Sequence, residues 1–275
     1  MNILLITPIY STHYDAGWFW LRALNQLGHS VTVWDYRLDR NPPPLFHYPE
    51  VTLVLKGENI DPKKLPSPHV CYWPDALDRT PGIENHLRKY DKVFALVKPI
   101  PDWMEWLPTG WDPAIHRDLQ VERKGTTYIG TCNSIYKKDM IEAIRPDLVH
   151  GNNWDYSYLP PVYLHDFVRC ANVAKVLIDV HQAPNAGPNR KFFEMIACGF
   201  TIVDRVPGVE EVLGKDLSDQ VSFKTPEEAK ELITYFVDKY SEREELWRLE
   251  RERIKPYTYQ AAAETVLNSI KGGRE

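Results

Sequence analysis

The sequence contains only four cysteines, and none of them stands close to another in the chain. This spacing provides neither the thiol pairs of a disulfide framework nor the short Cys-x-x-Cys pairs of a zinc site. The histidines are scattered as well, without the closely spaced His or Asp pairs that hold a divalent metal. We therefore expect buried free thiols and chemistry that needs no metal and no cofactor.

The chain also lacks an excess of positive charge and a long apolar run near its start. Its formal net charge of −5 excludes a global positive field of the kind that drives sequence-independent binding to nucleic acids. Only four consecutive apolar residues, 3–6, follow the first two positions, which is too few for a signal peptide or a membrane span. We expect a cytoplasmic protein.

A glycine-rich dinucleotide fingerprint is missing too. The segment after the first apolar run, residues 7–17, has one glycine and no Gly-x-Gly-x-x-Gly pattern. That pattern lets the backbone approach a dinucleotide pyrophosphate closely, so its absence disfavours a dinucleotide-dependent oxidoreductase.

Short apolar runs alternate with helical patterns along the whole chain, which is typical of parallel sheets built from strand-helix-strand units. Expected strands cover residues 3–6, 31–34, 51–55, 70–73, 93–97, 127–130, 148–151, 176–180, 200–204 and 221–223. The pattern predicts an α/β fold of two Rossmann-like βαβ domains that face each other across a cleft. We assign residues 1–112 to the first domain, 113–255 to the second domain, and 256–275 to a helix that packs back on the first domain.

Residues 186–200 are the most informative segment, because they are consistent with a loop, a helix, a stop and a strand. Arg190 stands in the first turn of the expected helix, directly after Asn189, where the helix dipole disfavours a cation. Local stability does not explain an arginine at this position. A diphosphate would explain it, since the exposed N–H groups of a helix start and an arginine together form an anion site.

Glu194 lies one turn further along the same face of this helix. Its carboxylate can accept two hydrogen bonds from a vicinal diol such as a ribose. The alternative is an ordinary surface ion pair between Arg190 and Glu194, worth a few tenths of a kcal/mol.

The stretch Phe193-Glu194-Met195-Ile196-Ala197-Cys198-Gly199 resembles the donor-site signature of GT-B glycosyltransferases. The closer resemblance is to the CgeB-like branch, whose pattern has an arginine four residues before the glutamate, as Arg190 is here. Further pieces of the family pattern occur in the same order at residues 107–113, 128–131 and 151–154.

The resemblance implies that Glu194 holds the ribose of a nucleotide-sugar donor, and that Arg190 and the helix start hold its diphosphate. A UDP-sugar is expected from its frequency in the family. Two positions depart from the pattern. Many relatives carry a second, sugar-binding glutamate where this chain has Ala186, and a basic residue is common where residues 261–263 are alanines.

Two further loops of the second domain are expected to contribute to donor binding. Lys137 follows Gly130 and Thr131 in the chain, a placement from which its ammonium can reach the leaving diphosphate. The alternative is that Lys137 and Lys138 are solvated lysines. Asn152, Asn153 and Trp154 follow the next strand. They fit a nucleobase pocket, or a turn with a buried tryptophan.

The first domain is expected to supply the acceptor site and any general base. His13 and Asp15 stand in the loop after the first strand, and Asp75 stands in the loop after a later strand. A carboxylate or histidine near the attacking hydroxyl is needed for an inverting transfer, whereas a retaining transfer can rely on the leaving phosphate instead. Asp75 resembles an acidic position of CgeB-like relatives. The alternative for each residue is a local role in a turn or a helix cap.

These observations favour a transferase that moves a sugar from a nucleotide-diphosphate donor to an unidentified hydroxyl acceptor. A protein, a glycan, a lipid-linked sugar, a small molecule and a modified DNA base all stay open as acceptors. The alternatives are a nucleotide-sugar epimerase with the same fold, because a fold does not fix its function, and a non-catalytic sugar-nucleotide or glycan-binding protein.

Overall fold

The computed structural model describes residues 1–9, 16–45, 47–154 and 159–271. The chain divides into two compact units, each with its own parallel sheet. Unit 1 comprises residues 1–109 and 257–275, and unit 2 comprises residues 110–256. His13 and Asp15 lie outside the described residues, so the structure does not place these two base candidates.

Unit 1 contains a sheet of six parallel strands in the order β2-β1-β3-β4-β5-β6. The strands are β1 (Asn2–Ile6), β2 (Ser30–Trp34), β3 (Val51–Leu55), β4 (His69–Trp73), β5 (Lys92–Ala95) and β6 (Glu105–Trp106). Its α-helices are α1 (Ala16–Gln26), α2 (Ile83–Leu87) and α10 (Tyr259–Lys271). Every side chain of β3 and β4 is buried, as expected for central strands covered on both faces.

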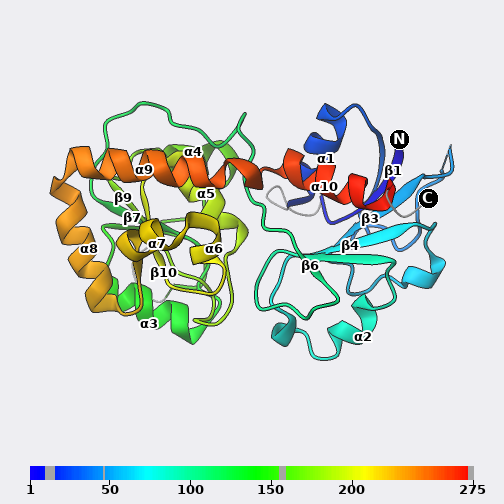
Figure 1. Cartoon of the computed structure of the whole chain (residues 1–275), viewed down its shortest axis with the longest axis horizontal. Helices are drawn as coiled ribbons and strands as arrows, with labels where there is room; N and C mark the ends of the chain where they lie inside the picture. Colours follow the sequence, from blue (N-terminus) through cyan, green and yellow to red (C-terminus); the bar gives the residue numbers. More distant parts are fainter. Residues whose placement is uncertain (10–15, 46, 155–158, 272–275) are drawn as a thin grey trace. The chain divides into compact units, whose positions relative to one another are not determined.

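Helix α10 returns from the end of the chain to pack on α1 (Figure 1). The ring of Tyr259 stacks on Phe19 with centroids 4.9 Å apart and meets Trp20 edge-on at 6.3 Å. Stacked and edge-on aromatic pairs of this kind stabilise a contact beyond the area they bury. The last helix therefore belongs to the first unit, as the sequence predicted.

Unit 2 contains a sheet of five parallel strands in the order β11-β10-β9-β7-β8. The strands are β7 (Thr126–Ile129), β8 (Leu148–His150), β9 (Val176–Asp179), β10 (Thr201–Asp204) and β11 (Ser222–Phe223). Its helices are α3 (Ile135–Ile144), α4 (Leu164–Asn172), α5 (Arg190–Cys198), α6 (Val209–Leu213), α7 (Lys215–Val221), α8 (Pro226–Asp238) and α9 (Tyr240–Ile254).

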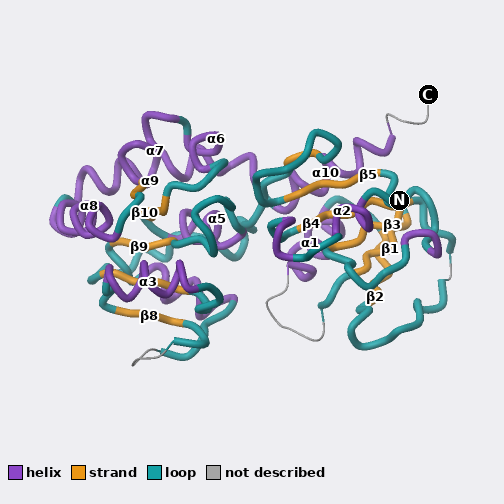
Figure 2. The backbone as a smooth tube through the Cα atoms, turned by 90° about the horizontal axis from the view of Figure 1, so that it is seen from below, coloured by secondary structure: helices purple, strands orange, loops and turns teal. Residues whose placement is uncertain are grey.

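Helices cover both faces of the second sheet, with α4 and α5 on one face and α3 on the other (Figure 1). Figure 2 shows the same sheet from below, in which β9 neighbours β10 and is separated from β8 by β7. All residues of β7, β9 and β10 are buried, as expected for parallel strands that are covered on both faces.

The strand order of unit 2 locates its ligand edge. Across the sheet the strands follow the order β8-β7-β9-β10-β11. The chain leaves β7 toward β8 on one side and leaves β9 toward β10 on the other, so these two connections run in opposite directions. In open α/β sheets, ligands bind beyond the carboxyl ends of the strands at such a switch point. The loops that follow Ile129 and Asp179 are therefore where a site is expected.

The α/β class with two parallel-sheet domains is confirmed by the structure. One strand was missed: β6 consists of Glu105 and Trp106 alone. Two residues, one of them charged, give no apolar run, so only pairing with β5 makes this segment a strand.

Candidate functional site

Helix α5 begins at the carboxyl edge of the second sheet, and its start is capped. Asn189 is the N-cap residue, and its side-chain oxygen accepts a hydrogen bond from the backbone N–H of Phe192 at 3.2 Å. This bond satisfies one of the amides that a helix start leaves over, while the other early amides and the dipole favour an anion. Every residue from Phe192 to Cys198 is buried, so the helix is fixed along most of its length.

Glu194 is a buried carboxylate, with 6% of its surface exposed. The Nε atom of Arg190 lies 3.2 Å from its Oε1, and the Nε2 atom of His116 lies 3.8 Å from the same oxygen. Burial raises the pKa of Glu194 to about 7, although the charges of Arg190 and Lys191 oppose the rise. The surface ion pair considered from the sequence is therefore wrong, because only the arginine reaches solvent.

His116 is the neutral partner of this carboxylate. Burial and the charge of Arg190 lower the pKa of His116 to about 3. Its Nδ1 accepts a hydrogen bond from the backbone N–H of Asp112 at 3.0 Å. The ring proton is consequently on Nε2, the nitrogen that faces Glu194. His116 was not predicted from the sequence, although it lies just after the family-like segment 107–113.

Gly110 allows this segment to approach the start of α5. A Cβ atom at Gly110 would lie 2.5 Å from the carbonyl oxygen of Arg190 and 2.9 Å from the ring of Phe193. No side chain larger than hydrogen fits at these distances, so the backbone itself packs on the helix.

A second charged group lies at the switch point, under the loops that follow β7 and β9. Lys191 places its Nζ atom 3.0 Å from Oδ1 of Asp179 and 4.4 Å from the ring centre of Tyr128. Burial alone would lower the pKa of Lys191, but Asp179 and Tyr128 outweigh it and the net shift is upward. Asp179 is fully buried, and its pKa is lowered because the charge of Lys191 outweighs desolvation.

Lys137 completes this group from α3. The residue is 6% exposed, so the solvated lysine considered from the sequence is wrong for Lys137, whereas Lys138 is about one-third exposed and lies 4.0 Å from Glu142. Burial and the nearby charge of Lys191 lower the pKa of Lys137 to about 7. The charges of Asp179 and Asp204 act in the opposite direction but are outweighed. Two ammonium groups thus share one edge of the sheet, an arrangement that suits an anionic ligand.

The loop after β7 passes tightly over this group. A Cβ atom at Gly130 would lie 2.5 Å from the Tyr128 hydroxyl and 2.7 Å from Nζ of Lys191. Thr131 follows and is half-buried. The carbonyl oxygen of Gly130 accepts a hydrogen bond from Nε1 of Trp154 at 2.9 Å, so the two predicted loops are tied together.

Trp154 is buried, with its ring packed edge-on against Tyr128 at 5.5 Å. This geometry corresponds to the alternative of a turn with a buried tryptophan. Asn152 is exposed, and its carbonyl oxygen accepts a hydrogen bond from the backbone N–H of Cys132 at 2.9 Å. The structure therefore places Asn152, but not the Trp154 ring, at the surface of this edge.

Gly151 is the residue on which this loop pairing depends most. Its φ is +151°, and a Cβ atom there would lie 2.0 Å from the carbonyl oxygen of Gly130. We expect Gly151→Ala to lower the free energy of unfolding by about 3 kcal/mol or more, because backbone atoms cannot yield as a side chain can. Urea denaturation measures this.

Gly28→Ala is the matched control. Gly28 also has a positive φ, +78°, but a Cβ atom there meets nothing within 4 Å. Its substitution should lower the free energy of unfolding by only about 1 kcal/mol. Equal losses in the two variants would contradict the proposed tight contact at Gly151.

In unit 1, Asp75 stands directly beyond the carboxyl end of β4 and is part of a charged cluster. Its Oδ2 lies 3.0 Å from Nζ of Lys56, and its Oδ1 lies 3.7 Å from Nη1 of Arg79. Lys56 has a φ of +72°, a conformation that is uncommon for a residue with a side chain and that often occurs at functional sites. Asp75 therefore stays a candidate for the general base, at the carboxyl end of the strands of the first sheet.

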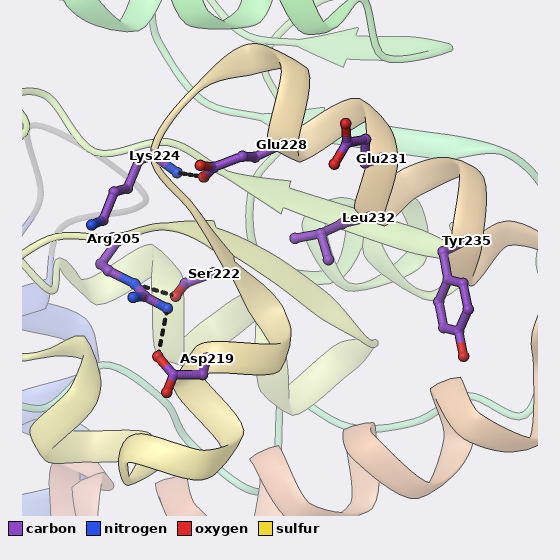
Figure 3. A pocket seen from close by; sticks show the side chains of 8 residues that line it. All are labelled: Arg205, Asp219, Ser222, Lys224, Glu228, Glu231, Leu232 and Tyr235. Atoms are coloured by element: carbon purple, nitrogen blue, oxygen red, sulfur yellow. Dashed lines mark hydrogen bonds and ion pairs between the residues drawn. The ribbon is translucent and has the colours of Figure 1, made fainter.

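A surface cavity of about 530 Å³ lies elsewhere in unit 2 (Figure 3). Its lining residues are Arg205, Asp219, Ser222, Lys224, Glu228, Glu231, Leu232 and Tyr235. Arg205 is already held by Asp219 at 2.8 Å and by Ser222 at 3.0 Å, as the dashed lines in Figure 3 show. The cavity contains none of the predicted donor residues, and its cations and carboxylates partly cancel each other.

Within the described part of the chain, no group of three or more His, Cys, Asp or Glu side chains is placed to hold a metal ion. No helix among the described residues is long and apolar enough to cross a membrane. All four cysteines are described, and no disulfide joins them.

The two parallel-sheet units define the GT-B fold class, and solved structures of that class are similar to this chain. A mutant of T4 phage β-glucosyltransferase bound to UDP-glucose has a TM-score of 0.63 and 10% identity, with 99% of each chain covered. The N-terminal domain of Candida albicans trehalose-6-phosphate phosphatase has a TM-score of 0.63 and 8% identity, covering 100% of this chain and 97% of the other. The spinosyn forosaminyltransferase SpnP has a TM-score of 0.53 and 13% identity, covering 98% and 99%.

A glycosyl transferase-like family model matches residues 134–268, a range that contains α3, α5 and most of unit 2. No curated protein matches the chain in sequence. The similarity to a glycosyl transferase-like family therefore extends over residues 134–268, and the solved neighbours, at these low identities, show the fold alone.

Proposed function

We propose that the protein is a glycosyltransferase that binds a nucleotide-diphosphate sugar at the carboxyl edge of the unit 2 sheet. The observation that carries this proposal is the buried carboxylate of Glu194, one turn after the anion-binding start of α5 and ion-paired with Arg190. A diol acceptor next to an anion site matches the adjacent ribose and diphosphate of such a donor. The glycosyl transferase-like match covers the same helix.

A UDP-sugar is the donor we propose. The T4 phage neighbour contains UDP-glucose, which supports a uridine nucleotide in this fold. The four-residue spacing of Arg190 and Glu194 supports a place in the CgeB-like branch, and the UDP-glucose of the T4 phage neighbour supports a hexose as the transferred sugar. The other residues proposed to contact the donor are Asn189, Lys137, Gly130, Thr131 and Asn152, with Trp154 supporting the loop from inside.

In the proposed reaction, an acceptor hydroxyl attacks the anomeric carbon, and the bond from that carbon to the phosphate oxygen breaks. The electron pair leaves with the diphosphate, whose growing charge is stabilised by Lys137, Lys191, Arg190 and the α5 dipole. The hydroxyl proton passes to a general base, the role that we propose for Asp75. Because the anomeric carbon gains the acceptor oxygen as it loses the phosphate oxygen, atoms and charge balance.

These cations lead us to propose that transfer does not require a metal. A T4 phage neighbour contains UDP and Mn²⁺, so the point needs its own test. We expect UDP release from UDP-glucose, measured without an acceptor as slow hydrolysis, to change less than about twofold when EDTA is added, since fixed cations already neutralise the diphosphate.

Two other outcomes of this assay would change the account. A strict requirement for Mn²⁺ or Mg²⁺ would contradict metal independence while leaving the transferase intact. Binding of UDP-glucose without UDP release, even with a broad panel of acceptors, would contradict the transferase proposal and support a non-catalytic sugar-nucleotide-binding protein.

A further inference from the structure

The backbone N–H of Asn189 donates a hydrogen bond to His181, a residue that we do not place in contact with the donor. The N–H of Asn189 lies 3.1 Å from Nε2 of His181, a residue that is 1% exposed. The side chain of Asn189 meanwhile caps α5 through Phe192. Both the backbone and the side chain of Asn189, the last residue before the helix, are therefore fixed, and this determines where the first helical amides lie.

The ring of His181 is itself fixed by Asp204, the last residue of β10. Its Nδ1 lies 2.6 Å from Oδ1 of Asp204, and its backbone N–H donates to both carboxylate oxygens at 3.0 Å. The hydroxyl of Tyr136 donates to Oδ2 of the same carboxylate at 3.2 Å. Asp204 is fully buried, so these partners are what compensates its charge.

The two contacts of the ring decide its tautomer. Nε2 must be unprotonated, because it accepts the N–H of Asn189, and Nδ1 must therefore carry the proton that is donated to Asp204. The Asp204 carboxylate stabilises this tautomer, as carboxylate–histidine pairs do elsewhere. A continuous chain of hydrogen bonds thus runs from Tyr136 through Asp204 and His181 to the residue that begins the anion site.

We propose that His181 is a positioning residue of the diphosphate site: it sets the start of α5 through Asn189, and Asp204 holds it in the required tautomer. This inference rests on the proposed function, since it concerns the same donor site. It assigns to His181 no contact with the donor. A misplacement of a few tenths of an ångström at the helix start should weaken contacts with the diphosphate but not those with the nucleoside.

A pair of substitutions separates the two nitrogens of the ring. His181→Asn keeps an amide near the Nδ1 position, facing Asp204, but offers no acceptor to Asn189. His181→Gln places an amide oxygen near the Nε2 position and can accept the Asn189 N–H. We expect the affinity for UDP to fall about tenfold in His181→Asn and to recover most of that loss in His181→Gln, as for one lost buried hydrogen bond.

The affinity for uridine, measured by ligand-observed NMR, should stay at the wild-type value in both variants. Tyr136→Phe is a milder variant that removes only the outer hydrogen bond on Asp204, and should lower UDP affinity about twofold. If His181→Asn does not fold, the Tyr136→Phe result and the His181→Gln result decide the question by the same comparison of UDP with uridine.

Three results would overturn the inference. The first is that His181→Asn binds UDP as tightly as wild type does. The second is that His181→Asn loses UDP and uridine affinity equally. The third is that His181→Gln does not recover the UDP affinity that His181→Asn loses. If wild type binds UDP and Glu194→Gln weakens that binding, each of these results counts against the role of His181 alone. If wild type binds neither UDP nor any other nucleoside diphosphate, the proposed function fails first, and the inference fails with it.

Discussion

Replacing Glu194 with glutamine should lower the affinity for UDP-glucose by a factor of about 10 to 100 without loss of the fold. The carboxylate accepts two hydrogen bonds from a diol, whereas the amide has one oxygen acceptor and turns a donor toward the ligand. A hydrogen bond to a charged group contributes about 1.5–3 kcal/mol, which corresponds to this range. Isothermal titration calorimetry measures the affinity.

The fold should tolerate the change, because the carboxylate is buried and its pKa is already raised to about 7 by desolvation. A neutral amide of the same shape removes the need to bury a charge. Thermal unfolding of Glu194→Gln should therefore match wild type within a few degrees.

Glu250→Gln is the matched control. Glu250 is fully buried on α9, and its carboxylate accepts the N–H of Thr201, at the opposite end of β10 from the ligand edge. Its substitution should leave the affinity for UDP-glucose unchanged. The ribose role of Glu194 would be contradicted if Glu194→Gln bound as wild type does, or if both variants lost affinity equally.

Donor affinity should have a maximum near pH 7, and Lys137 should account for the alkaline side of the curve. Its ammonium makes no hydrogen bond or ion pair with the described residues, and burial lowers its pKa to about 7. A diphosphate placed beside it would raise that pKa, so binding takes up a proton. Affinity is then full below the pKa of the free protein and falls as pH rises through about 7.

Glu194 should account for the acidic side. Its raised pKa of about 7 means that it is protonated below neutral pH, where it loses the acceptor capacity that the ribose requires. Affinity should therefore fall as pH decreases through about 7. A nucleotide sugar is the right ligand for this measurement, because it lacks the terminal phosphate that ionises near pH 6 in UDP.

Calorimetry across this pH range, on wild type and three variants, tests the assignment. Lys137→Met should lose the alkaline decline, and Glu194→Gln should lose the acidic one. Lys138→Met is the control, because Lys138 is the next residue of α3, is more exposed and lies near Glu142. An alkaline decline that persists in Lys137→Met would contradict the role of Lys137.

The pH dependence of stability provides a second readout with a defined sign. The folded pKa of Lys137 lies below its ordinary value of 10.5, so the unfolded chain binds more protons between those values. The stability of the ligand-free protein should therefore rise with pH from about 7 toward 10.5 by this contribution, and Lys137→Met should remove it.

Much of the framework could be predicted from the sequence, because buried strands such as β3 and β9 are short runs of mainly apolar residues and α5 has its own start and stop signals. Arg190 and Glu194 could also be predicted from the sequence, because residues four apart on one helix lie on the same face. The proposed anion site at the start of α5 could be inferred without knowledge of the neighbouring elements.

The spacing of residues along the chain could not predict four other residues of the site, namely Lys191, Asp179, His181 and Asp204. They come from α5 and from the ends of β9 and β10, and only the strand order brings them together. A charged residue at the end of a buried strand was the available signal for Asp179 and Asp204. The burial of Trp154 depends likewise on its contact with Tyr128, which no local pattern reveals.

The central claim is that unit 2 holds a nucleoside diphosphate between Glu194 and the start of α5. Calorimetric titration of the full chain with UDP, GDP, ADP and their glucose conjugates tests it most directly, in wild type and Glu194→Gln. We predict selective binding of one nucleotide series, with UDP expected, that is weakened at least about tenfold in the variant. No binding of any series, or equal affinity in the two proteins, would contradict the account.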